Sequence, residues 1–113
     1  MSNYDPELID IETVRERKRL ARSGVMTILI AVNLVEGRVV TAPRFIAGGI
    51  ASASAMKKIQ HELRDMIYDF FANKRNLALS HDEMEDEIRI LARRYLMELT
   101  DKKPVVNVII VNG

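Results

Sequence analysis

Cysteine is absent from the 113-residue sequence. Its absence excludes disulfide bonds and zinc sites built on cysteine ligands, and it favours a reducing compartment. Residues 1–10 are acidic and lack the basic stretch followed by an apolar stretch that is typical of a secretory signal. We therefore expect a cytoplasmic protein.

The sequence also lacks a strong excess of charge and a long apolar run. It has 17 Lys and Arg against 16 Asp and Glu, so its net charge does not by itself predict nucleic-acid binding. Its longest apolar stretches, residues 25–32 and 105–111, each contain a polar residue and are far too short to span a bilayer. We expect no membrane partner, and the length is typical of one domain.

The beginning of the chain divides into a short tail and the start of the domain. Residues 1–12 are interpreted as a tail or incoming linker, and residues 13–113 as the domain. Within the domain, residues 13–22 predict a leading helix that is rich in Arg, Lys and Glu, and Gly24 supplies its end.

A β-hairpin is predicted next. Residues 25–35 are dominated by branched side chains and predict a strand, which a tight turn at Glu36 and Gly37 connects to a second strand at residues 38–46. Pro43 cannot donate a hydrogen bond to a neighbouring strand, so we expect the second strand at an edge of the sheet.

Two helices and a last strand complete the predicted elements. Residues 54–74 have apolar side chains at spacings of three and four, which predicts an amphipathic helix. Ser80 and Glu83 form a capping-box pattern that predicts the start of another helix, and residues 101–104 end it. Residues 105–111 predict the last strand.

The order of these elements predicts an α+β fold. Two antiparallel helices between the second and third strands make the third strand parallel to the first. The first strand is the most apolar, so we place it at the centre. The prediction is a three-stranded mixed sheet, formed by the hairpin and the C-terminal strand and packed against two antiparallel helices, with a leading N-terminal helix.

One face of this sheet is left over. The two helices cover one face, whereas the first and last strands carry apolar side chains on both faces. A leftover apolar face is usually an interaction surface, here for a second copy of the chain. The alternative is that the leading helix folds back over it. The interface candidates are Val25, Ile28, Leu29, Val108 and Ile110.

No catalytic chemistry is predicted for this chain. His61 and His81 lie on different predicted helices, and neither stands in a metal-binding motif. No nucleophile motif is present, and Ser52 and Ser54 are better interpreted as caps of the following helix. We therefore assign no catalytic residue, metal ligand or cofactor here.

Basic residues on the leading helix suggest a second hypothesis. They could contact RNA phosphates, although few aromatic residues lie among them for base stacking. A solvated basic helix is the competing interpretation. The RNA-contact candidates are Arg15, Arg17, Lys18, Arg19 and Arg22.

Three segments, in their order and spacing along the chain, resemble a known family. They are VRERKRLARSG at residues 14–24 with the apolar strand that follows, GRVVTAP at residues 37–43, and YLMELTDKKPVV at residues 95–106. Together they resemble the C-terminal domain of ribonuclease J across residues 13–111. The chain departs from the usual pattern at residues 42–44 and 48–50, where the family has a Gly-Pro-Asp turn and an Arg-Gly-Phe segment.

The resemblance implies a bacterial RNA-processing and RNA-degrading enzyme of the metallo-β-lactamase/β-CASP type. In that family the last domain has a three-stranded sheet against two helices and supports the assembly of dimers and tetramers. The zinc ligands and the pocket for the RNA 5′ end lie in other domains, so zinc is expected in the parent protein and not in this chain. The departures are compatible with a paralogous partner subunit.

Overall fold

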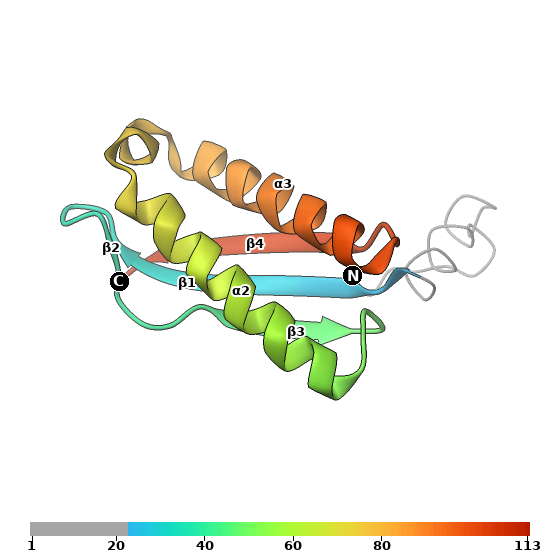
Figure 1. Ribbon diagram of the computed structural model, residues 1–113. Coiled ribbons are helices and arrows are strands. Elements are labelled where there is room, and N and C mark those ends of the chain that lie inside the picture. The colour runs from blue at the N-terminus through green and yellow to red at the C-terminus, as the bar shows by residue number, and fades with distance from the viewer. Residues whose placement is uncertain (1–22) are drawn as a thin grey trace, which may run out of the picture.

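A computed structural model of the protein describes residues 23–113 and shows a sheet built around one central strand. The central strand is β1 (Val25–Asn33), and β4 (Val105–Asn112) pairs with it in parallel along nearly its full length. On its other side, β2 (Arg38–Val39) and β3 (Arg44–Gly48) pair with it antiparallel (Figure 1). The predicted α+β class, the mixed strand directions and the central position of the first strand are confirmed.

The prediction of a single second strand is wrong, because this segment forms two strands, β2 and β3. The sheet therefore has four strands and not three. Between its pairings with β2 and β3, β1 has two residues, 30 and 31, whereas the opposite segment has four, residues 40–43. The extra length cannot follow the regular ladder, and Pro43 within it lacks an N–H group. The predicted leading helix, residues 13–22, and the predicted tail, residues 1–12, lie outside the described residues.

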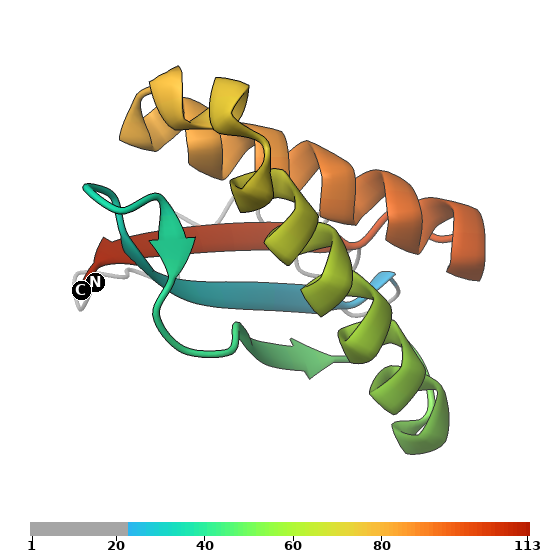
Figure 2. The same ribbon diagram turned by 60° about the vertical axis from the view of Figure 1, so that its left-hand side comes forward.

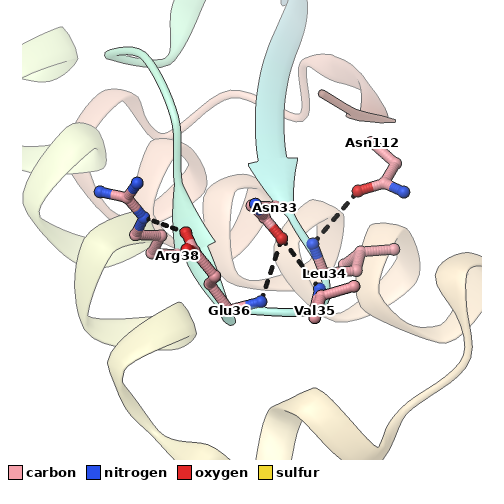
Figure 3. A network of polar contacts seen from close by, with 6 residues as sticks. All are labelled: Asn33, Leu34, Val35, Glu36, Arg38 and Asn112. Atoms are coloured by element: carbon pink, nitrogen blue, oxygen red, sulfur yellow. Dashed lines mark hydrogen bonds and ion pairs between the residues drawn. The ribbon is translucent and has the colours of Figure 1, made fainter.

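A network of polar contacts holds the turn between β1 and β2 (Figure 3). The Asn33 side-chain oxygen accepts hydrogen bonds from the backbone N–H groups of Val35 and Glu36, both at 3.0 Å. The side-chain oxygen of Asn112, at the end of β4, accepts from the backbone N–H of Leu34 at 3.1 Å. The hairpin turn is therefore tied to the last strand, which lies 78 residues later in the chain.

The two long helices begin and end where their capping residues dictate. In α2 (Ala53–Ala72), Ser52 caps the N-terminus through a hydrogen bond from Ala55 N–H. The chain then passes through a short 3-10 helix, η2 (Lys74–Ala78), that the sequence did not predict. In α3 (His81–Thr100), Ser80 and Glu83 form the predicted capping box, and the left-handed Asp101 ends the helix.

Both helices cover the same face of the sheet (Figure 2). The side chains of β1 alternate strictly, and those at even positions are essentially inaccessible beneath the helices. They join apolar residues from α2, α3 and β4 in a single core. The fully buried members from the strands and helices include Met26, Ile28, Ile30, Val32, Ile59, Leu63, Ile67, Ile88 and Leu96.

Candidate interaction surface

The face of the sheet opposite α2 and α3 carries the odd-numbered side chains of β1. Because successive side chains of a strand point to opposite faces, burial of Met26, Ile28 and Ile30 sends Val25, Thr27 and Leu29 to the other face. We call this second face the outer face. No described helix covers it (Figures 1 and 2).

The strand register shows which neighbours join these residues. Val105, Asn107, Ile109 and Val111 of β4 lie beside Val25, Thr27, Leu29 and Ala31 of β1, respectively. On the other side of β1, Ile46 of β3 lies beside Thr27 and Arg44 lies beside Leu29. Residues that pair across neighbouring strands share a face, so the outer face spans all three rows of strands.

Apolar side chains dominate this outer face and are accessible. Val25 is 37% exposed, Ile46 63%, Ile109 45% and Val111 51%, while Leu29 is half-buried between its neighbours. Among the strand residues described on this face, only Arg38, which pairs with Asn33, and Arg44 carry a charge. A contiguous apolar area with few charges is typical of a protein–protein contact.

The sequence-based interface candidates divide between the two faces. Val25 and Leu29 lie on the outer face. Ile28 and Ile110 are fully buried in the core beneath the helices, and Val108 packs against that core, so these three do not belong to the outer face. The sequence did not separate the two faces, because the side chains at both even and odd positions of β1 and β4 are mostly apolar. Hydrophobicity alone therefore does not predict which face the helices cover.

Three outer-face residues were missed: Ile46, Ile109 and Val111. A signal for two of them was present in the sequence, because Thr27 and Asn107 are the polar interruptions of the two apolar strands. A polar residue within an apolar strand marks its accessible face. Residues two and four positions beyond Asn107 therefore share that face.

The two histidines lie apart and make local contacts. His61 Nε2 is 3.7 Å from Asp65 Oδ2 on α2, and His81 Nε2 is 3.3 Å from Glu85 Oε2 on α3. Both contacts join residues four positions apart on one helix, which is a common surface arrangement. Among residues 23–113, no group of three or more side chains is placed to hold a metal ion.

Two polar groups with shifted pKa values have structural roles. Burial, reinforced by the hydrogen bond that Tyr95 donates to Glu62 and by the charge of that carboxylate, raises the pKa of Tyr95 to about 12. The hydrogen bonds that Glu83 receives from Ser80 lower the pKa of that carboxyl group. The first contact joins α2 to α3 and the second caps α3, so neither group is part of the outer face.

The candidates for RNA contact, residues 15–22, lie outside the described part of the chain. Within the described part, no helix is long and apolar enough to cross a membrane.

Comparison with known proteins identifies the domain. The family model for the ribonuclease J C-terminal domain matches residues 12–113. The chain belongs to the ribonuclease J C-terminal domain family. This confirms the resemblance that the three sequence segments indicated. In ribonuclease J this domain is a non-catalytic accessory module. None of the curated proteins matches the chain in sequence.

Proposed function

We propose that this ribonuclease J C-terminal domain is a non-catalytic assembly module that joins two copies of its parent through the outer face. The observation that carries the proposal is the accessible apolar surface of the sheet. Its accessible members come from β1, β3 and β4, and they are Val25, Leu29, Ile46, Ile109 and Val111. Zinc and the cleavage of RNA would belong to the other domains of the parent.

The energetics favour a second copy of the chain as the occupant of this face. Burying one Leu or Ile side chain contributes about 1.5–3 kcal/mol, so a few such residues from each copy can support association after its entropic cost. A two-fold arrangement buries the same residues of both copies at once, and it is the most common symmetry of homo-oligomers.

Adjacent residues on opposite faces of β1 provide a sharp test. We expect Leu29→Asp to remove association through the outer face, seen as a lower mass in sedimentation velocity, while circular dichroism stays that of the folded protein. Ile28→Asp should instead unfold the domain, because its carboxylate would lie unpaired in the core at a cost of several kcal/mol. Ile90→Asp is the surface control, since Ile90 is 45% exposed on α3 and should change neither property.

The contrary results are equally distinct. A wild-type chain that stays monomeric at high concentration, with Leu29→Asp unfolded like Ile28→Asp, would show that the outer face is covered within the chain. This outcome would favour the alternative in which the leading helix folds over the sheet.

The competing function is an RNA-binding module that uses the leading helix. Its motivating residues are basic and closely spaced, and phosphate contacts would make affinity fall steeply with salt. A filter-binding titration at two salt concentrations distinguishes the two functions. Micromolar binding that is lost when Arg15, Arg17 and Arg19 are replaced by Ala would favour the RNA-binding module.

A further inference from the structure

The two edges of the sheet are built differently. The edge formed by β2 and β3 has strands of two and five residues, interrupted by a segment that contains Pro43. The opposite edge is β4, an uninterrupted strand of eight residues without charge or proline, and no described strand pairs with its far side (Figure 1). Interruptions, prolines and charges protect edge strands from pairing, so only the β2–β3 edge is protected.

The hydrogen-bonding groups on the free side of β4 can be identified from its ends. Val105 N–H donates to Gly24 at 3.1 Å, and Gly113 N–H donates to Val32 at 2.8 Å. Since alternate residues of a parallel strand bond to the same neighbour, the odd positions face β1 and the N–H groups of Val106, Val108 and Ile110 point away from it.

One of these outward groups has a side-chain partner. Ile110 N–H donates to Glu85 Oε2 at 2.8 Å, so a carboxylate from α3 occupies the position where a backbone carbonyl of another strand would lie. Glu85 also contacts His81, and its side chain is 26% exposed. The edge of β4 is therefore covered at one point by a single side chain.

Along this edge, the charge of the side chains from α3 and from the loop that follows it changes from negative to positive. Near Val108 and Ile109, a surface depression is lined by Glu85, Asp86 and Arg89. Near Val105 and Val106, an adjoining depression is lined by Arg89, Arg93 and Lys103. Arg89 is already paired with Asp86 at 3.0 Å, which leaves Glu85 at one end and Arg93 and Lys103 at the other.

We propose that the free edge of β4 pairs antiparallel with β4 of a second copy, so that the two sheets become continuous. A two-fold axis across this edge sets the Ile110 end of each strand against the Val106 end of the other. Glu85 of each copy then lies beside Arg93 of the second copy. On docking, Ile110 N–H exchanges the Glu85 carboxylate for a backbone carbonyl of the facing strand.

The charge pattern favours a second copy over other occupants. Either RNA phosphates or an acidic peptide would meet the carboxylates of Glu85 and Asp86 along the same groove, whereas an antiparallel copy meets each charge with its opposite. This edge is distinct from the outer face. A chain with both surfaces can assemble beyond a dimer.

Charge reversal with rescue tests the proposal in the Leu29→Asp background, in which association through the outer face is removed. Arg93→Glu and Glu85→Arg, each alone, are expected to raise the dissociation constant of the remaining complex on the order of tenfold, since each substitution acts twice across the axis. The double variant restores opposite charges and should recover most of the affinity in sedimentation. The control is Arg94→Glu, which makes the same charge change on a neighbouring residue that does not line the β4 edge.

The possible contrary outcomes overturn the proposal in different ways. It is overturned if both single variants sediment like their background, or if the double variant is no better than either single one. It is also overturned if Arg93→Glu weakens binding of a single-stranded RNA probe while sedimentation is unchanged, because the groove would then be an RNA contact. Failure of the outer face is recognised separately, since Leu29→Asp would then leave the association of the otherwise wild-type chain unchanged.

Discussion

Gly24 lies where the chain enters the sheet, and replacing it should lower the free energy of unfolding. Its φ is +84°, a left-handed conformation that costs an L-residue about 1–2 kcal/mol. A Cβ atom built there would lie 2.8 Å from the Gly48 carbonyl oxygen and 2.7 Å from Ile50 Cγ1. The Gly48 contact is with backbone, so it cannot be relieved by rotating a side chain, and overpacking of this kind costs about 1–3 kcal/mol.

We therefore expect Gly24→Ala to lower the free energy of unfolding by about 2–5 kcal/mol, the sum of these two costs. The assay is urea denaturation followed by circular dichroism, analysed by linear extrapolation. Gly48→Ala is the matched control, because a Cβ atom there meets nothing within 4 Å and should change stability by less than about 1 kcal/mol. Equal losses for the two variants would refute the argument from close approach.

Three further predictions concern the helices and the core. Ser80→Ala removes the hydroxyl that caps α3 and should cost about 1 kcal/mol in urea denaturation; no loss would contradict a stabilising capping box. Tyr95 has a pKa of about 12 in the folded protein, above its usual value of about 10 when unfolded. The stabilisation from neutral Tyr95 is thus present below pH ~10 and lost as the pH rises toward ~12. The free energy of unfolding of the wild type should therefore fall more steeply than that of Tyr95→Phe over that window. Parallel curves of unfolding free energy against pH for the two proteins would contradict this. Leu63→Ala should cost about 2–5 kcal/mol because Leu63 is fully buried, and a loss below 1 kcal/mol would contradict its place in the core.

The sequence predicted the helices and the sheet order well because their signals are local. The capping box at Ser80 and Glu83 gave the start of α3, and the apolar spacing of α2 gave the buried face of that helix. The parallel pairing of β1 with β4 followed from the two helices between the strands, which reverse the chain twice.

The details that failed depend on tertiary context. The division of the edge strand into β2 and β3 reflects two extra residues in its register, which composition does not reveal. The choice between Ile28 and Leu29 for the accessible face depends on which side the helices cover, and both residues are equally apolar. The Glu85 contact with Ile110 N–H joins residues 25 positions apart and has no sequence motif.

Contacts between methyl groups of different copies test most directly our proposal that the outer face lies between two copies of the chain. An isotope-filtered NOE experiment on a mixture of 13C-labelled and unlabelled chains detects only contacts between copies. We expect intermolecular cross-peaks at the methyl groups of Val25, Leu29, Ile109 and Val111, and none at the buried methyl groups of Ile28. Cross-peaks confined to methyl groups of the helices, or a complete absence of intermolecular signals at high concentration, would contradict it.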